Sequence, residues 1–222
     1  ELKKNGYVVL KDLLEPNLVE ELFKITKTLK CTNNQLDQNT PKIYFDEKTC
    51  TLPTYYYEQN ELLKNQAVKS VINYFDNLKI SDYYFASKPY LIAVNMWWST
   101  VSDKPDSFAA QKYHFDIDSI KWLKFFVYLT DVGEDGGPHS YVEGTHKPFS
   151  KPFKILKRGY ERISDEEIKS YYSSEKIKKI LGQKGTIIIG DTSCFHKGVF
   201  PQKKSRLIFE VSFANSFFGP LL

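Results

Sequence analysis

The stretch "YHFDIDS", residues 113 to 119, decides how the rest of the chain is read. It places His114 and Asp116 two positions apart in an aromatic segment with the composition of an extended strand. Side chains alternate between the two faces of a strand, so both are expected to point the same way, with Phe115 on the other face. A histidine and a carboxylate on one face provide two ligands for a metal ion.

A third ligand is needed, and the strongest candidate is His196 in "GDTSCFHKGVF", residues 190 to 200. It lies 82 positions after His114 (196 minus 114), a separation closed only where distant strands lie side by side, as in a barrel. Two neutral imidazoles and one carboxylate on one face of a metal are typical of non-haem Fe(II) oxygenases. Taken alone, however, "HFD" also fits a histidine that is only hydrogen-bonded in the core. Other residues are needed to distinguish a metal site from this alternative.

The apolar spacing along the chain predicts helices first and strands afterwards. Helices are expected over 15–30 and 58–78, with residues 31–57 polar and irregular between them. A capping box at Ser164 and Glu167 predicts a third helix over 164–181. Short aromatic or β-branched runs predict strands at 6–10, 90–99, 120–132, 185–191 and 205–213. We therefore expect one domain over 1–222, with a helical part over 1–89 that supports a β sandwich or barrel over 90–219.

Arg206 opens the last predicted strand, ten positions after His196. In "SRLIFEVSF" the side chains of one face are all apolar, whereas Arg206, Ile208 and Glu210 lie on the other face. If the apolar face packs against helices or a second sheet, Arg206 faces the interior of a barrel. A buried arginine requires an anion, and a guanidinium binds a carboxylate through two parallel hydrogen bonds. An exposed arginine at a strand end is the alternative interpretation.

Composition excludes several classes of protein. The net charge is +4, from 31 basic and 27 acidic residues that are scattered, so we expect no nucleic-acid partner. No apolar run approaches the roughly 18 residues of a membrane-spanning helix, and no membrane association is expected. Cys31, Cys50 and Cys194 form no CxxC pair, which predicts a reducing, cytoplasmic setting without a disulfide framework. The sequence indicates no particular oligomeric state.

Three stretches together resemble a known family. They are "YHFD" (113–116), "KFFVYLTDVGEDGGPHSYVEGTHK" (124–147) and "GDTSCFHKGVFPQKKSRLIFEVSF" (190–213). They look like the phytanoyl-CoA dioxygenase family of Fe(II)/2-oxoglutarate-dependent oxygenases. The opening "LKKNGYVVLKDLLEPNLVEEL", residues 2 to 22, is also similar to the way these proteins begin.

The resemblance implies a double-stranded β-helix, the jelly roll of cupin-like proteins. It implies that His114, Asp116 and His196 bind Fe(II) and that Arg206 holds the distal carboxylate of 2-oxoglutarate. With O2, such enzymes oxidise a small-molecule substrate and release succinate and CO2. Because related halogenases lack the carboxylate ligand, Asp116 favours hydroxylation.

Other residues have less definite roles. Gln111 and Lys124 have the polarity to contact 2-oxoglutarate. Because Lys124 shares its strand face with aromatic residues, it also fits a surface lysine that lies over them. His146 falls on a histidine of the family that is not a ligand, and His139 is read either as facing the substrate or as exposed. Cys194 is assigned no role.

Substrate choice is expected to depend on the loops 31–57, 99–112 and 147–181. The basic stretch 147–158 favours an anionic substrate. Three alternative functions stay open: a cupin-like metal-binding module without oxygenase activity, a zinc-type hydrolase, and a partner-binding protein that uses the helix at 164–181. Arg206 argues against the bare module, and the missing HExxH helix argues against the hydrolase.

Overall fold

The computed structural model describes residues 1–34, 40–101, 110–117 and 119–216. The end of the predicted β core, 217–219, lies outside these residues, as do parts of two loops expected to set specificity, 35–39 and 102–109.

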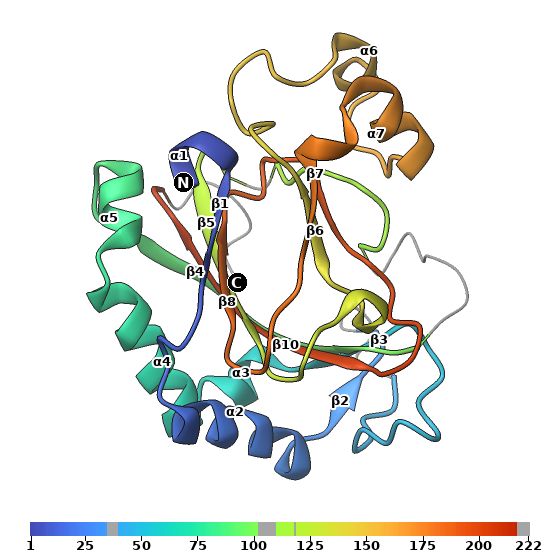
Figure 1. Ribbon diagram of the computed structural model, residues 1–222. Helices are drawn as coiled ribbons and strands as arrows, with labels where there is room; N and C mark the ends of the chain where they lie inside the picture. Colours follow the sequence, from blue (N-terminus) through green and yellow to red (C-terminus); the bar gives the residue numbers. More distant parts are fainter. Residues whose placement is uncertain (35–39, 102–109, 118, 217–222) are drawn as a thin grey trace.

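Two antiparallel sheets form the body of the protein (Figure 1). The larger sheet has the strand order β1-β8-β5-β10-β4-β3-β2, and the smaller one has the order β7-β6-β9. The large sheet comprises β1 (Tyr7–Leu10), β2 (Cys31–Thr32), β3 (Thr54–Tyr57), β4 (Tyr90–Ser99), β5 (Trp122–Tyr128), β8 (Ile187–Gly190) and β10 (Arg206–Ala214). The small sheet comprises β6 (His139–Val142), β7 (Ile177–Ile180) and β9 (His196–Gly198). The predicted mainly β fold of the jelly-roll type is confirmed.

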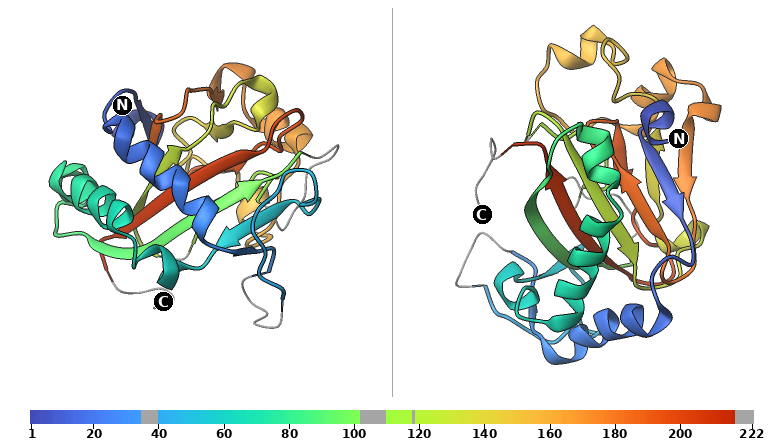
Figure 2. Two further views of the ribbon diagram at one scale, coloured as in Figure 1. Left: turned by 90° about the horizontal axis from the view of Figure 1, so that it is seen from below. Right: turned by 90° about the vertical axis from the view of Figure 1, so that its left-hand side faces the viewer.

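Helices cover the outer face of the large sheet (Figures 1 and 2). These are α2 (Pro16–Thr28), α3 (Gln59–Leu62), α4 (Gln66–Asn77) and α5 (Ile80–Phe85). The main hydrophobic core joins Leu22, Val71 and Phe75 from the helices to Phe125 and Phe209 of the sheet. Burial of these large apolar side chains is the dominant stabilising contribution to this layer.

Strand β10 shows how the alternation of side chains positions the site. The residues of its apolar face, Leu207, Phe209, Val211 and Phe213, belong to the core beneath the helices, as predicted. Ile208 points the other way, into a second core shared with Tyr141 of the small sheet. Arg206 and Glu210 lie on the same side as Ile208, so they face the space between the sheets.

The helix predicted over 164–181 is wrong in its second half. Ser164 caps α7 (Asp165–Tyr171) by accepting a hydrogen bond from the Glu167 N–H, but the helix ends at Tyr171. The short 3-10 helix η2 (Ser174–Lys176) and strand β7 follow, and β7 pairs with β6. Serines favour turns and caps over helix interiors, which accounts for the break.

Other differences concern short elements. The helix predicted over 58–78 is divided into α3 and α4, because Asn65 starts α4 by accepting a hydrogen bond from the Ala67 N–H at 2.9 Å. The region 31–57, expected to be irregular, contributes β2 and β3 to the large sheet. Six further short elements were not predicted: α5, β6 and β9, together with α1 (Leu2–Asn5), η1 (Glu134–Gly136) and α6 (Phe153–Leu156).

Candidate metal centre

The two candidate histidine ligands lie side by side, although they are far apart in the sequence. Their backbones form an antiparallel bridge, in which the His114 N–H donates to the His196 carbonyl at 3.0 Å and the His196 N–H donates back at 2.9 Å. The ring centroids are 4.3 Å apart. Directly opposed residues of an antiparallel pair place their side chains on the same face, so this bridge explains the convergence.

Asp116 completes a cluster with these histidines. Its N–H donates to the Thr192 carbonyl at 2.9 Å, which ties residue 116 to the turn after β8. Its Oδ1 lies 3.7 Å from His114 Nε2, and its Oδ2 lies 4.0 Å from His196 Nε2. One ligand atom from each of the three residues falls within 4.8 Å of the others, the only such grouping in the described part of the chain. We call His114, Asp116 and His196 the triad.

The tautomers of both imidazoles are set by backbone carbonyl groups. His114 Nδ1 lies 2.9 Å from the Lys112 carbonyl oxygen, and His196 Nδ1 lies 3.0 Å from the Cys194 carbonyl oxygen. A carbonyl oxygen can only accept, so Nδ1 carries the proton in both rings. The unprotonated Nε2 atoms therefore face Asp116, which is the arrangement that a divalent metal ion requires.

The protonation states also suit a metal. Burial, together with the neighbouring His196, lowers the pKa of His114 to about 2, and burial also lowers the pKa of His196. Burial alone would raise the pKa of Asp116, but Lys124 Nζ, 2.9 Å from Oδ2, holds that pKa below its ordinary value. At neutral pH the cluster thus offers two neutral imidazoles and one carboxylate, which fit a 2-His-1-carboxylate metal site.

The triad opens into a cavity of about 290 Å³ between the two sheets. This volume is at the small end of the range for ligand pockets. The described residues that line it are Tyr56, Asn95, Trp97, Ala110, His114, Asp116, Lys124, Phe126, His139, Tyr160, Arg162, His196, Gly198, Arg206 and Glu210. We call it the triad cavity.

Arg206 is buried in the wall of the triad cavity, with only 3% of its surface exposed. Its Nη2 donates to Ser99 Oγ at 3.2 Å, whereas Nε and Nη1 have no hydrogen-bond partner among the described residues. Burial lowers the pKa of Arg206 to about 10, so the guanidinium stays charged at neutral pH. A Cβ atom at residue 198 would lie 2.9 Å from Nη2, so Gly198 provides the room that the guanidinium occupies.

Lys124 and Gln111, the two other residues expected to contact 2-oxoglutarate, occupy different positions in the structure. Lys124 lines the triad cavity, and its ion pair with Asp116 shows a contact that sequence analysis did not foresee. Gln111 is buried, with 1% exposure, and is not one of the residues that line the cavity. A contact of either residue with 2-oxoglutarate stays a prediction.

The other two histidines occupy different surroundings. His139 is 4% exposed, lines the triad cavity and has its ring centroid 4.4 Å from that of Phe126. Its interpretation as an exposed residue is therefore wrong. His146 lies outside the triad, with Nδ1 3.5 Å from Cys194 Sγ and Nε2 3.3 Å from the Lys3 carbonyl oxygen.

Sequence reasoning missed several residues of the cavity wall. Glu210 could have been predicted to line the cavity, because it lies four positions after Arg206 on the same face of the strand. Tyr160 and Arg162 could not, because they lie in a segment without periodicity between α6 and α7. Only the folded chain brings that segment to the cavity.

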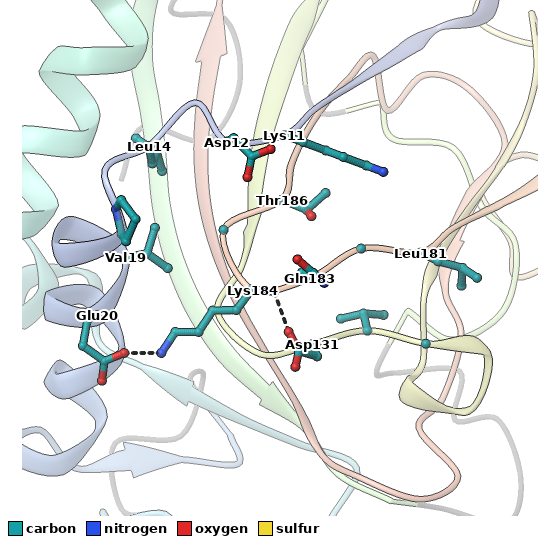
Figure 3. Close-up of a pocket in the computed structure, with 15 residues that line it drawn as sticks. Lys11, Asp12, Leu14, Val19, Glu20, Asp131, Leu181, Gln183, Lys184 and Thr186 are labelled. Atoms are coloured by element: carbon teal, nitrogen blue, oxygen red, sulfur yellow. Dashed lines mark hydrogen bonds and ion pairs between the residues drawn. The ribbon is translucent and has the colours of Figure 1, made fainter.

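A larger cavity of about 860 Å³ lies elsewhere, where the chain leaves β1 and β5 and enters β8 (Figure 3). Lys184 lines it, with Nζ 2.5 Å from Glu20 Oε2 and its backbone N–H donating to Asp131 Oδ1 at 2.8 Å. Its lining contains no histidine or cysteine. Size therefore does not mark the chemical site in this fold, and the smaller cavity is the candidate.

Comparison with known families agrees with the geometry of the site. The family model described as phytanoyl-CoA dioxygenase (PhyH) matches residues 2–199. The chain belongs to the phytanoyl-CoA dioxygenase family. The resemblance found in the sequence is thus confirmed, and the match spans the whole triad of this phytanoyl-CoA dioxygenase family member. No curated protein matches the chain.

Solved structures share the fold of this family member at low sequence identity. The epimerase SnoN from nogalamycin biosynthesis, in complex with Fe3+, alpha ketoglutarate and nogalamycin RO, is 14% identical, with a TM-score of 0.65 over 99% of this chain and 84% of that chain. HygX from Streptomyces hygroscopicus, with nickel and 2-oxoglutarate bound, is 16% identical, with a TM-score of 0.61 over 98% and 86%. EctD from S. alaskensis is 15% identical, with a TM-score of 0.60 over 100% and 76%. These likenesses establish the common fold.

None of the described helices has the length and apolar character needed to cross a membrane.

Proposed function

We propose that this protein is an Fe(II)- and 2-oxoglutarate-dependent dioxygenase, with the triad as iron ligands and Arg206 as the anchor of 2-oxoglutarate. The observation that carries the proposal is that a buried guanidinium lines the same cavity as the triad, and that two of its nitrogens have no hydrogen-bond partner among the described residues. A keto diacid suits both features, because its keto acid end binds a metal and its distal carboxylate binds a guanidinium. Solved structures of the same fold hold a metal and this cosubstrate together.

Iron and 2-oxoglutarate, when bound, supply the oxidative chemistry, with O2 as oxidant and succinate and CO2 as products. The chain's own residues set the geometry. The carbonyl groups of Lys112 and Cys194 fix the imidazole rings of the triad, and Lys124 keeps Asp116 ionised. Aromatic side chains of the cavity wall, among them Trp97 and Phe126, restrict water around the metal ligands.

We further propose that the reaction is the hydroxylation of a small metabolite. The presence of Asp116 as a third protein ligand supports this choice over halogenation, and a cavity of about 290 Å³ supports a small substrate. Relatives of the fold include an epimerase and a carbocyclase, so product analysis must distinguish these outcomes. We also propose a reducing, cytoplasmic setting, supported by three buried free cysteines.

The test is formation of succinate from 2-oxoglutarate by the Fe(II)-loaded protein, measured in air and under nitrogen. We expect succinate in air only, loss of it in His196→Ala, and retention of it in His146→Ala. A protein that binds iron and 2-oxoglutarate but forms no succinate in air would be the cupin-like binding module. Hydrolytic activity that persists with zinc and without O2 would indicate the zinc-type hydrolase.

A further inference from the structure

Arg162 reaches the triad cavity through a backbone bridge next to the metal ligands. The Tyr113 N–H donates to the Ile163 carbonyl at 3.1 Å, and the Ile163 N–H donates to the Tyr113 carbonyl at 2.7 Å. Tyr113 and Ile163 both pack into a hydrophobic cluster with Ile168 of α7. Their neighbours His114 and Arg162 lie on the opposite side, and both line the cavity. The bridge thus holds Arg162 beside an iron ligand.

The guanidinium of Arg162 is positioned but not neutralised. Its Cζ lies 5.4 Å from the centroid of the Tyr160 ring, and its Nη1 is buried without a hydrogen-bond partner among the described residues. Arg158, four positions earlier, contrasts with it: its Nη2 forms ion pairs with Glu161 and, at 2.7 Å, with Glu167. Arg162 is half-buried, and the unmet hydrogen-bonding capacity of its buried Nη1 indicates a missing anion.

Arg162 and Arg206 act on different parts of the cavity. Arg162 precedes Ile163, whose backbone bridges Tyr113 next to His114, whereas Arg206 lies at the start of β10 and donates to Ser99 of β4. After burial, the charge of Arg206 is the next cause of the low pKa of His139. Arg162 is therefore a second cation on the triad side, separate from the one assigned to 2-oxoglutarate.

The described residues of the cavity wall carry an excess of one positive charge. Among the described lining residues, Lys124, Arg162 and Arg206 are cations, and Asp116 and Glu210 are carboxylates. Iron(II) and the 2-oxoglutarate dianion cancel one another, so their binding does not change this excess. An anion bound at Arg162 would balance this excess.

We propose that Arg162, stacked on Tyr160, binds an anionic group of the primary substrate, so that the enzyme selects small metabolites with one carboxylate. The inference rests on the proposed function, because it places the substrate anion beside the iron. It also replaces the earlier argument from the basic stretch 147–158, since no residue of that stretch lines the triad cavity.

The experiment measures binding without turnover. Protein loaded with Mn(II) and 2-oxoglutarate is kept under nitrogen, and its occupancy by both is verified first by calorimetry. N-acetyl amino acids and the matching primary amides then serve as probes, and the paramagnetic relaxation of their protons by Mn(II) reports binding next to the metal. We expect Mn(II) to relax the protons of the bound N-acetyl amino acids. The matching amides should bind at least tenfold more weakly than these acids.

Variants locate the anion subsite. Arg162→Gln is expected to weaken acid binding about tenfold to a hundredfold, as loss of charge-assisted hydrogen bonds predicts, with 2-oxoglutarate affinity unchanged. Arg162→Lys should retain part of the affinity. Arg158→Gln is the matched control in the same segment, and it should bind acids as the wild type does.

Each other result has a definite meaning. Equal binding of acids and amides, undiminished acid binding by Arg162→Gln, or no acid binding to the verified complex would overturn the proposal. Weaker binding of 2-oxoglutarate, rather than of acids, in Arg162→Gln would assign this arginine to the cosubstrate and also overturn it. A wild-type protein that fails to bind 2-oxoglutarate in the first step would instead refute the proposed function on which the inference rests.

Discussion

Replacement of Arg206 by methionine tests the anchoring of 2-oxoglutarate quantitatively. In the wild type, Nε and Nη1 have no hydrogen-bond partner in the part of the chain that the structure describes, so both can donate to a carboxylate. Hydrogen bonds to charged groups contribute roughly 1.5–3 kcal/mol each. Taking the lower value for both, because water enters the space that methionine leaves, the loss is about 3 kcal/mol. This corresponds to a rise of about 150-fold in the dissociation constant of 2-oxoglutarate.

The same substitution has the opposite effect on the protein without cosubstrate. There the guanidinium is 3% exposed and pairs only with Ser99 among the described residues, so it is a buried charge without a counter-ion. Removing such a charge is expected to stabilise the fold by about 1 kcal/mol, or about 2–4 °C in Tm for a chain of this length. With 2-oxoglutarate at 100 times its Kd, the wild type gains about 2.7 kcal/mol and becomes the more stable protein.

The assay is thermal unfolding of Mn(II)-loaded protein with and without 2-oxoglutarate, supported by calorimetric titration. The order of stability of wild type and Arg206→Met should reverse when the cosubstrate is added. Lys184→Met, which removes a half-buried cation paired with Glu20 in the larger cavity, is the control and should leave 2-oxoglutarate affinity unchanged. Wild-type affinity in Arg206→Met would refute the reasoning and point to Lys124 as the anchor. A destabilised apo variant would refute the claim of an uncompensated charge.

Three further results are expected. Alanine in place of either triad histidine should abolish Fe(II) binding, measured by metal analysis of the folded protein, whereas His146→Ala should retain one iron; equal iron content in all variants would contradict the triad. Gly198→Ala should displace the guanidinium of Arg206 and raise the Michaelis constant for 2-oxoglutarate at least tenfold with little change in melting temperature, since its Cβ would lie 2.9 Å from Nη2; an unchanged constant would contradict this packing. The metal-free protein should lose stability from pH 7.5 to 5.5, because the unfolded chain protonates histidines near pH 6.5 and buried His139, whose pKa is well below that value, does not. His139→Phe should remove about 1.4 kcal/mol of this loss, measured by urea unfolding, and an equal pH dependence in both proteins would argue against a buried neutral imidazole.

Local patterns in the sequence predicted the parts of the fold that depend on alternation. The two faces of β10 follow the predicted alternation, and β4, β5 and β8 lie within the predicted aromatic or β-branched runs. Hydrophobic spacing did not predict the element boundaries where short polar sequences interrupt a helix or strand. Residues 177–180 have helix-compatible composition, but they pair with β6, and this pairing overrides local propensity.

The candidate site could be predicted from the sequence only where its residues occur in a motif with a known chemical role. "HFD", the distant His196 and Arg206 at a strand start, together with the family resemblance, predicted four side chains that line one cavity. Arg162 was not predictable, because nothing in "GYERIS" distinguishes it from Arg158, and only the bridge between Tyr113 and Ile163 turns it toward the triad.

Calorimetric titration of 2-oxoglutarate into the protein, with and without Mn(II), tests most directly whether the triad and Arg206 form one binding site. We predict one equivalent of 2-oxoglutarate bound in the presence of the metal, with affinity reduced strongly when the metal is omitted or when His196 is replaced by alanine. Equal affinity in all three conditions would show that the cosubstrate does not contact a metal held by the triad, and would contradict the account.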